Sequence, residues 1–319
     1  MQEHLGFLFP GQGSQRIGML SEAAQAFPVV AETFGEASEA LGYDLWALTQ
    51  AGDPATLNLT EYAQPALLTA SVSLWRAWLA AGGPRPAAMA GHSLGELSAL
   101  CCADVFTLAD AVRLVQERGR AMQQAVPVGE GAMAAVIGLS AEQVIAICAE
   151  VSASLNAVVA AVNFNSEAQV VIAGQTAAVD YTIERLIGAG AKRALPLPVS
   201  APFHTSLMAP AGERMAVVLQ AISLKAPTIP VIHNVHARSE SDPERIRELL
   251  VSQISAPVRW TDCMGKLMGT GCRQLVECGA GKVLGGLARR IDKSLSCAFI
   301  EQPDDLHAAV QKLSAGDGN

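Results

Sequence analysis

Short apolar runs and longer amphipathic segments alternate along the chain. The runs at 5–9 and 87–91 are bounded by turn-forming residues, which predicts short buried strands. Segments 28–41 and 61–80 place apolar residues at helical spacing and are followed closely by glycines, which predicts helices. Strands that alternate with helices favour an α/β protein whose mainly parallel sheet is covered on both faces.

The middle of the chain shows a different order. Strands are expected at 132–139, 158–164, 169–173 and 192–197, and helices at 140–151 and 177–186. This β-α-β-β-α-β order is the ferredoxin-like arrangement, and turns that contain proline bound it on both sides. We therefore expect an α/β domain formed by residues 1–128 and 198–319, interrupted by a ferredoxin-like subdomain at 129–197.

The α/β pattern continues on both sides of this insertion. Further helices are expected from residue 94 onward and at 107–124, 206–222, 243–254, 261–268 and 283–291, and further strands at 231–235, 274–278 and 297–300. The chain after residue 313 carries no such pattern and is expected to fray.

Composition narrows the class of protein. Of the 319 residues, 50% are hydrophobic and 16% are charged, and the net charge is −8. These values rule out intrinsic disorder, which needs low hydrophobicity, and give a nucleic-acid surface no global electrostatic support. No apolar run reaches the ~18 residues of a membrane span, and the first residues lack the basic and apolar regions of a signal peptide. We expect neither a nucleic-acid nor a membrane partner.

The cysteines and the glycine-rich segments carry no cofactor signal. The chain has 7 cysteines without a C-x-x-C pair, which is typical of reduced thiols in a cytoplasmic protein, and no cluster has metal-ligand spacing. Gly11-Gln12-Gly13 is followed by Arg16 where a dinucleotide-binding turn needs glycine. Gly279-Ala280-Gly281-Lys282 lacks the Walker A spacing. No metal and no nucleotide cofactor is therefore expected.

One segment has the pattern of an exposed nucleophile. Gly91-His92-Ser93-Leu94-Gly95 matches G-x-S-x-G and lies between an expected strand and an expected helix, which is the setting that this motif requires. The glycines permit a sharp turn, and the following helix N-terminus favours developing negative charge. Ser93 is therefore predicted to be a nucleophile; the alternative is that it only caps the helix.

A serine nucleophile needs a base, and the chain has 6 histidines. His204 follows a loop just beyond the insertion, and catalytic groups are often held on such loops by a rigid scaffold. His233 and His236 lie around an expected strand end and His92 adjoins the serine, so structural or surface roles suit these three better. His204 leads as the candidate base, without excluding the others.

Arg118 lies on the apolar stripe of its expected helix. Ala111, Val115 and Met122 share this face at helical spacing. A buried guanidinium needs an anion or several acceptors. One interpretation is a structural ion pair with a neighbouring glutamate, Glu96 or Glu117. The other interpretation is a binding group for a substrate carboxylate, because a guanidinium can donate two parallel hydrogen bonds to the two carboxylate oxygens.

Seven motifs follow one another over essentially the whole chain. They are Phe9-Pro10-Gly11-Gln12-Gly13-Ser14-Gln15, Gln64-Pro65-Ala66, Gly91-His92-Ser93-Leu94-Gly95-Glu96, Arg118-Gly119, Val162-Asn163-Phe164-Asn165-Ser166, Ala201-Pro202-Phe203-His204 and Gly279-Ala280-Gly281-Lys282-Val283-Leu284. Together they resemble the malonyl-CoA:acyl carrier protein transacylases of type II fatty acid synthesis. The resemblance implies a hydrolase-like α/β core that carries a ferredoxin-like subdomain, in agreement with the pattern of elements.

The resemblance also implies a role for each matching residue. Ser93 would attack the malonyl thioester, and His204 would take its proton and return it to the leaving thiol. The backbone N–H groups of Gln12 and Leu94 would form the oxyanion hole. Arg118 would clamp the malonyl carboxylate. The substrates would be malonyl-CoA and acyl carrier protein, with no cofactor, and the enzyme would act as a monomer.

Further positions are assigned by the same resemblance. A backbone carbonyl would orient the histidine, and Gln253 occupies the matching segment. Gln64 and Asn163 would line the cleft, and the bulk of Phe203 goes with malonyl over branched acyl units in related acyltransferases. Ala280 departs from the family, which has proline in a Gly-Pro-Gly turn here; we expect the turn to survive with alanine at negative φ.

A carrier-protein surface is expected on a helix end. Acyl carrier proteins are acidic, and Arg289 and Arg290 end a helix that starts at the cleft-side loop 279–281. A merely solvated helix end is an equally open interpretation.

Three other functions share part of these features. A serine thioesterase or hydrolase would need Ser93 and His204 but not a buried Arg118. A non-catalytic acyl-CoA-binding subunit would need neither reactive residue. The malonyl transferase subunit of a malonate decarboxylase shares the same motifs, so the acceptor of the acyl group has to separate it from the favoured function.

Overall fold

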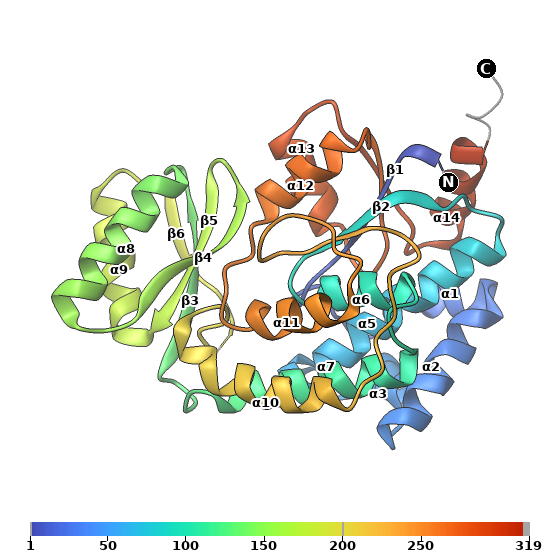
Figure 1. Ribbon diagram of the computed structural model, residues 1–319, viewed down its shortest axis with the longest axis horizontal. Coiled ribbons are helices and arrows are strands. Elements are labelled where there is room, and N and C mark those ends of the chain that lie inside the picture. Colours follow the sequence, from blue (N-terminus) through green and yellow to red (C-terminus); the bar gives the residue numbers. More distant parts are fainter. Residues whose placement is uncertain (1, 200, 315–319) are drawn as a thin grey trace.

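Two sheets, each with its own helices, form two lobes (Figure 1). The computed structural model describes residues 2–199 and 201–314. The larger lobe is built on a five-stranded parallel sheet with the strand order β7 (Val231–Ile232), β2 (Pro86–Gly91), β1 (Gln2–Phe9), β8 (Gln274–Glu277) and β9 (Ser296–Phe299). The smaller lobe is built on a separate four-stranded sheet. The chain enters it after α7 (Leu108–Gln124) and has left it by α10 (Ala209–Gln220).

Strand β1 lies at the centre of the parallel sheet and is buried on both faces. Phe7 and Phe9 belong to one hydrophobic core, whereas Leu8 between them belongs to another. Successive side chains of a strand point to opposite faces, so these two cores lie on the two sides of the sheet. A central parallel strand covered on both faces explains the uninterrupted apolar run at 5–9.

Helices cover both faces of this sheet, as Figure 1 shows. The core around Phe7 and Phe9 takes apolar residues from the helices α1 (Ser21–Ala26), α2 (Pro28–Leu41), α3 (Leu45–Ala51), α4 (Pro54–Asn58), α5 (Thr60–Ala80), α6 (Leu94–Cys102), α7, α10, α11 (Pro243–Gln253) and α14 (Pro303–Ser314). The core around Leu8 takes them from α12 (Trp260–Gly269) and α13 (Val283–Ile291). No helix in the described part of the chain is both long and apolar enough to span a membrane.

The smaller lobe has the expected ferredoxin-like order. Its elements are β3 (Gly131–Ile137), α8 (Ala141–Leu155), β4 (Val159–Ser166), β5 (Gln169–Gln175), α9 (Thr176–Gly188) and β6 (Arg193–Pro196). The sheet order is β4-β5-β3-β6, and all neighbours are antiparallel. The predicted capping box of Ser140 and Gln143 opens α8. The proposed limits of the insertion, 129 and 197, fall just outside β3 and β6.

The fold class is confirmed, and most elements lie within a few residues of their expected positions. Strand β7 has only two residues where 231–235 was expected, because the chain turns back: the N–H of Ala237 donates to the carbonyl of His233. The segment expected as one helix at 206–222 begins with a 3₁₀ turn, Ser206–Met208, before α10. The helices α1, α3, α4 and α14 were not predicted. Fraying was expected after residue 313; Ser314 ends α14, and residues 315–319 lie outside the described chain.

Candidate active site

The sharp turn between β2 and α6 places Ser93 at the edge of the sheet. Ser93 has φ 51° and ψ −108°, a strained conformation for a residue with a side chain. A Cβ on Gly91 would lie 1.9 Å from the carbonyl carbon of Gly95, and a Cβ on Gly95 would lie 2.0 Å from the oxygen of Phe9. Both motif glycines are therefore required by close backbone approach. Ser93 is the N-cap residue of α6, but its side chain makes no capping hydrogen bond, so capping does not explain it.

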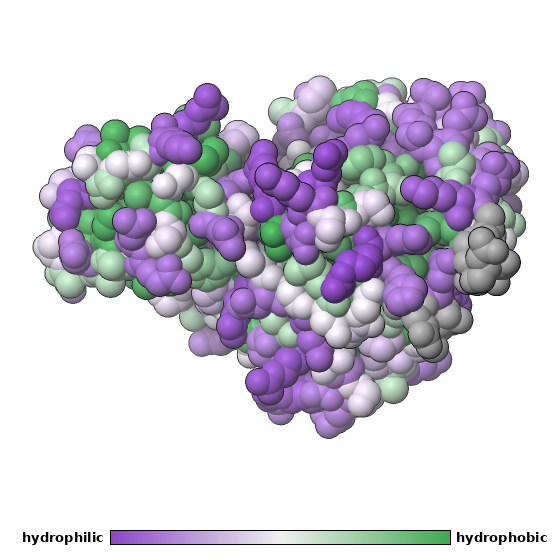
Figure 2. All heavy atoms as spheres, turned by 90° about the horizontal axis from the view of Figure 1, so that it is seen from above, coloured by the Kyte–Doolittle hydropathy of each residue, from purple (hydrophilic) through white to green (hydrophobic). Residues whose placement is uncertain are grey.

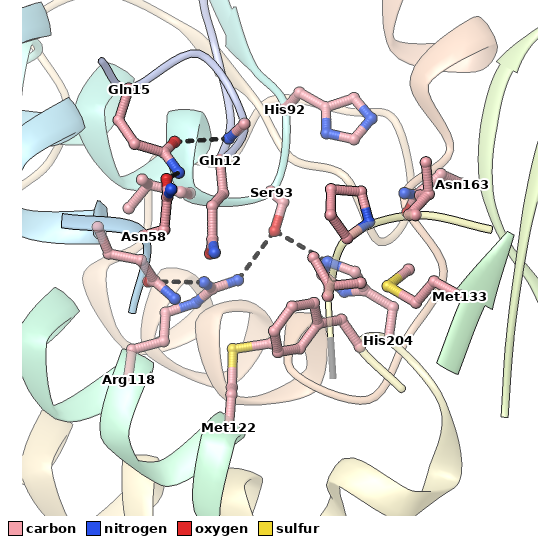
Figure 3. A pocket seen from close by; sticks show the side chains of 17 residues that line it. Gln12, Gln15, Asn58, His92, Ser93, Arg118, Met122, Met133, Asn163 and His204 are labelled. Atoms are coloured by element: carbon pink, nitrogen blue, oxygen red, sulfur yellow. Dashed lines mark hydrogen bonds between the residues drawn. The ribbon is translucent and has the colours of Figure 1, made fainter. Parts of the chain in front are cut away.

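The hydroxyl of Ser93 faces His204 (Figure 3). The distance from Ser93 Oγ to His204 Nε2 is 2.8 Å, and His204 Nδ1 lies 3.0 Å from the backbone oxygen of Gln253. A carbonyl can only accept, so the ring proton belongs on Nδ1 and Nε2 is free to accept from Ser93. The arrangement is that of a serine with an oriented imidazole base, and the orienting group is a backbone carbonyl.

The surroundings of His204 keep its ring neutral. The side chain is buried, and this burial, assisted by the positive charge of Arg118, lowers the pKa of His204 to about 3. The hydrogen bond to the backbone of Gln253 acts in the opposite direction. A neutral imidazole is the form that can take a proton from a serine.

Arg118 lies beside the same serine. Its Nη2 donates to Ser93 Oγ at 3.1 Å and to Gln253 Oε1 at 2.9 Å, and its Nη1 donates to Gln64 Oε1 at 2.8 Å. The side chain is buried, and Nε has no hydrogen-bond partner within the described chain. Desolvation lowers the pKa of Arg118 to about 10, opposed by the charge of Glu96.

The structural ion pairs considered for Arg118 are not formed among residues 2–199 and 201–314. Glu117 instead pairs with Arg120 and Arg214 on the surface. Glu96 is connected to the guanidinium only through the amide of Gln253. Three neutral oxygen atoms therefore hold a buried cation, which leaves its charge available to an anion.

A cavity of about 360 Å³ opens in front of these groups. Its lining comes from both lobes and comprises Gln12, Gly13, Gln15, Asn58, Gln64, His92, Ser93, Leu94, Arg118, Met122, Met133, Asn163, Leu197, Pro198, Val199, Phe203 and His204. Met133 and Asn163 belong to the strands β3 and β4 of the smaller lobe. The cavity thus lies between loops and helices of the larger lobe on one side and the smaller sheet on the other.

The expected oxyanion hole lies at this cavity. Gln12 and Leu94 both line it, and Leu94 is the first residue of α6. Within the part of the chain that is described, neither backbone N–H has an acceptor. Two free donors, of which Leu94 lies at a helix N-terminus, suit an oxygen that becomes negative during acyl transfer.

The remaining sequence-derived positions divide into two groups. Gln64, Asn163 and Phe203 line the cavity, and Asn163 Oδ1 is buried without a partner among the described residues. Arg289 and Arg290 are not part of it. They lie in the last turn of α13, where Arg290 Nη1 donates to Gln169 Oε1 of the smaller lobe at 2.6 Å.

Asn234 supports the nucleophile turn and was not predicted from the sequence. Its Oδ1 accepts from the N–H of Ser93 at 2.8 Å, and its Nδ2 donates to the carbonyl of Gly91 at 2.8 Å. The side chain therefore fixes the nucleophile turn from a segment 141 positions away in the chain. In the sequence it is a polar residue inside the strand expected at 231–235, which is not a specific signal.

The other histidines and the cysteines do not serve as base or nucleophile in this arrangement. His92 is half-buried with Nε2 2.9 Å from Asn165 Oδ1, and His233 is buried against Glu96. All seven cysteines are free, and burial raises the pKa of Cys101 and of Cys148 to about 12, which keeps them as thiols.

In the turn 279–281, Ala280 has a negative φ between two glycines with positive φ, as expected.

Comparison with known proteins decides the family. The acyl transferase domain model matches residues 6–287. The malonyl CoA-acyl carrier protein transacylase of Salmonella typhimurium is 53% identical, over 95% of this chain and 98% of its own. That of Bacillus subtilis is 41% identical over 99% of both chains. This chain belongs to the malonyl CoA-acyl carrier protein transacylase family. It is accordingly an acyltransferase.

Solved structures of malonyl CoA-acyl carrier protein transacylases share the fold throughout. The enzyme from Coxiella burnetii superposes with a TM-score of 0.96 at 44% identity, covering 98% of both chains. A second structure shows a malonyl-transacylase in complex with a type II polyketide synthase acyl carrier protein. It has a TM-score of 0.95 and 50% identity, covering 97% of this chain and 99% of that one.

Proposed function

We propose that this protein transfers a malonyl group from malonyl-CoA to the phosphopantetheine thiol of an acyl carrier protein in fatty acid synthesis. The position of Arg118 carries this proposal, because its buried guanidinium touches the oxygen of the candidate nucleophile. An enzyme for neutral acyl groups gains nothing from a buried cation at that point. The names of the relatives support the same substrate pair.

The first half-reaction loads the serine. His204 Nε2 takes the proton of Ser93 as Oγ attacks the thioester carbonyl of malonyl-CoA. The tetrahedral oxyanion lies against the N–H groups of Gln12 and Leu94. Collapse breaks the carbon–sulfur bond, and the imidazolium returns its proton to the sulfur of CoA, which leaves as the thiol. The product is a malonyl ester on Ser93.

The second half-reaction reverses these steps with another thiol. His204 takes the proton of the phosphopantetheine thiol, and the sulfur attacks the ester carbonyl. Collapse then breaks the bond to Oγ, and His204 returns the proton to Ser93. Throughout, Arg118 binds the malonyl carboxylate, and the carbonyl of Gln253 holds the imidazole through Nδ1. Serine and histidine end as they began.

The acceptor surface is proposed at the end of α13. Lys282, Arg289 and Lys293 border a hollow on this helix, and Arg290 lies beside them. Within the described chain none of the four forms an ion pair, so their charges are available to an acidic carrier protein. Figure 2 views the molecule from the side on which α13 lies in Figure 1, and hydrophilic side chains gather there beside the notch between the lobes.

We also propose a monomeric enzyme in the cytoplasm. The free state of all seven cysteines supports a reducing compartment. Sedimentation of the purified protein at a mass twice that of the chain would contradict the monomer.

A transfer assay with a competing acceptor tests the function. The protein is incubated with malonyl-CoA and holo acyl carrier protein in water, and malonyl-carrier, free malonate and the acylated peptide are measured by mass spectrometry. We expect malonyl on the peptide that contains Ser93, followed by transfer to the carrier. Malonate as the main product would identify a thioesterase. Transfer only to the carrier subunit of a malonate decarboxylase would identify that enzyme instead.

A further inference from the structure

A buried carboxylate lies behind the active site and does not touch the substrate cavity. Glu96 is fully buried on α6, three residues after Ser93. One of its oxygens lies 2.7 Å from His233 Nδ1, and the other accepts from the N–H of Asn234 at 2.8 Å and from Gln253 Nε2 at 2.8 Å. Nothing in the mechanism above uses this group directly.

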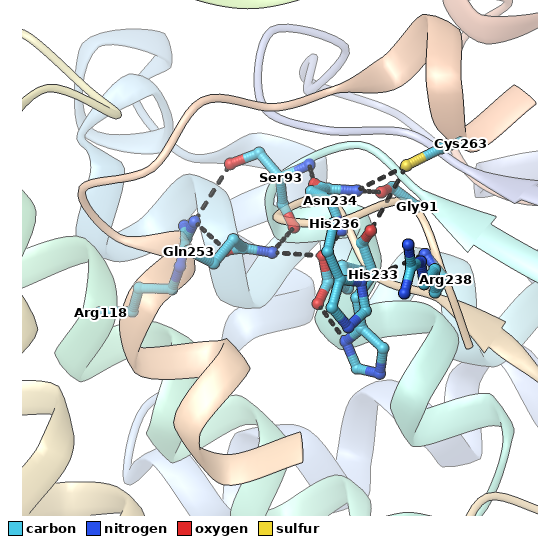
Figure 4. A network of polar contacts seen from close by, with 10 residues as sticks. Gly91, Ser93, Arg118, His233, Asn234, His236, Arg238, Gln253 and Cys263 are labelled. Atoms are coloured by element: carbon cyan, nitrogen blue, oxygen red, sulfur yellow. Dashed lines mark hydrogen bonds and ion pairs between the residues drawn. The ribbon is translucent and has the colours of Figure 1, made fainter. Parts of the chain in front are cut away.

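Gln253 connects this carboxylate to the guanidinium of Arg118 (Figure 4). Its Nε2 donates to Glu96 at 2.8 Å and to the carbonyl of Ser93 at 3.2 Å, and its Oε1 accepts from Arg118 Nη2 at 2.9 Å. The backbone carbonyl of the same residue holds His204. The specificity group and the base are thus both attached to Gln253, by its side chain and by its main chain.

The direction of the amide follows from the chemistry of its neighbours. An ionised carboxylate only accepts hydrogen bonds, and a guanidinium only donates them. The NH₂ end of Gln253 must therefore face Glu96 and the oxygen must face Arg118. A reversed amide would place two donors together at the guanidinium and two acceptors together at the carboxylate, both without hydrogen bonds.

We infer that Glu96 is a positioning residue, which fixes the amide of Gln253 and thereby aims the guanidinium of Arg118 at the acyl carboxylate. This inference rests on the proposed malonyl transfer. It requires an acceptor at position 96 and not a negative charge as such. A glutamine there can keep its oxygen toward Gln253 and Asn234 and turn its NH₂ toward His233 Nδ1. His233 then carries its ring proton on Nε2, which is buried without a partner among the described residues, so this variant can lose stability while it keeps the acceptor for Gln253.

Three substitutions test the inference through the ratio of kcat/KM for malonyl-CoA to that for acetyl-CoA. Glu96→Met removes the nearer acceptor and leaves Gln253 Nε2 only the 3.2 Å contact with the carbonyl of Ser93, and we expect the ratio to fall roughly tenfold or more. Glu96→Gln keeps an acceptor oxygen at position 96, so the malonyl-to-acetyl ratio should stay within about threefold of the wild-type ratio. Gln253→Met keeps the backbone carbonyl for His204 but loses the side-chain contacts with Arg118 and with the carbonyl of Ser93, so both activities can fall and the readout is the ratio, which should fall as in Glu96→Met. The double variant Glu96→Met/Gln253→Met should be no lower in ratio than Gln253→Met alone, because both act through one amide.

A matched control removes another buried carboxylate. Glu277 is fully buried and accepts from the N–H groups of Val283, Leu284 and Gly285 at the start of α13. Glu277→Met should lower thermal stability and leave the malonyl-to-acetyl ratio unchanged.

The outcomes separate this inference from the proposed function. Failure of the wild type to transfer malonyl groups would defeat the function itself. Equal loss of malonyl and acetyl activity in folded Glu96→Met would show a purely structural residue and overturn the inference, because Glu96 also holds Asn234 and through it the turn at Ser93. If Glu96→Met does not fold, Gln253→Met decides: an unchanged ratio there would show that the amide does not aim Arg118.

Discussion

The guanidinium of Arg118 donates a hydrogen bond to the hydroxyl of Ser93, with 3.1 Å between Nη2 and Oγ. In a malonyl ester, only the carbonyl carbon and one methylene separate Oγ from the carboxylate carbon. A guanidinium that already reaches Oγ is therefore close enough to bind that carboxylate, without room for a long acyl chain between them. The contact relates the choice of acyl group directly to the place where the acyl group is attached.

Replacement of Arg118 should change the choice of acyl donor. A hydrogen bond to a charged group contributes about 1.5–3 kcal/mol, or roughly ten- to a hundredfold in kcat/KM. We expect Arg118→Ala to lose this factor in kcat/KM for malonyl-CoA and to retain or gain acetyl transfer. Arg118→Lys should recover only part of the loss, because lysine keeps the charge but lacks the planar guanidinium group. Arg120→Ala, on the same helix but outside the cavity, is the control. Equal losses for both donors in folded Arg118→Ala would assign it a structural role.

The fall of kcat/KM on the acid side of the pH profile should occur at an unusually low pH. His204 acts as a base only when neutral, and its pKa is lowered to about 3 by burial and by the charge of Arg118. As pH falls from 8 to about 5, below the ordinary histidine value of ~6.5, kcat/KM should therefore stay nearly constant. Acetyl-CoA is the appropriate donor, because it has no carboxylate that titrates. A limb near pH 6.5 in the wild type would contradict the buried, neutral histidine.

The same profile reports on Arg118. Its cation is the second cause of the lowered pKa of His204, after burial. Removal of the cation in Arg118→Ala should raise that pKa and shift the acid limb of acetyl transfer toward higher pH. An unshifted limb would show that the charge of Arg118 does not act on the base.

Charge reversal at the end of α13 tests the carrier surface. We expect Arg289→Glu/Arg290→Glu to raise the KM for acyl carrier protein roughly tenfold and to leave the KM for malonyl-CoA nearly unchanged, since an acidic partner meets repulsion. Arg185→Glu/Arg245→Glu makes the same change of charge at exposed positions on other helices, α9 and α11. If both double variants raise the carrier KM alike, only net charge matters and the surface lies elsewhere.

The nucleophile turn should not tolerate a methyl group. A Cβ at position 95 would lie 2.0 Å from the oxygen of Phe9, so Gly95→Ala must displace the turn or the central strand. We expect a loss of stability of about 1–3 kcal/mol and a marked fall in serine acylation. Gly35→Ala in α2 has open space around it and should keep activity and raise stability by up to ~1 kcal/mol. A stable, active Gly95→Ala would refute the steric argument.

Local patterns in the sequence were sufficient for the fold and for the turn that carries Ser93. The G-x-S-x-G turn depends on neighbouring glycines, and the capping box of Ser140 and Gln143 on residues three apart, so each was visible in a short segment. His204 could be ranked first only by its loop. Its contact with Ser93 joins positions 111 residues apart, and spacing does not report such contacts.

The supporting polar groups could not be predicted for the same reason. Glu96 appeared only as a possible ion-pair partner of Arg118, whereas the structure inserts Gln253 between them. Asn234 acts through a side-chain hydrogen bond to a distant backbone. The short helices α1, α3 and α4 have too few turns to show a periodic pattern.

The two-walled cavity has a consequence for engineering. The nucleophile, the base and the carboxylate-binding arginine all stand on segments outside the ferredoxin-like insertion, whereas Met133 and Asn163 face them from inside it. A library of side chains confined to β3 and β4 therefore reshapes the room for the acyl group and leaves every catalytic hydrogen bond in place. Donor scope and catalytic competence can be evolved as separate traits, in two different lobes of one chain.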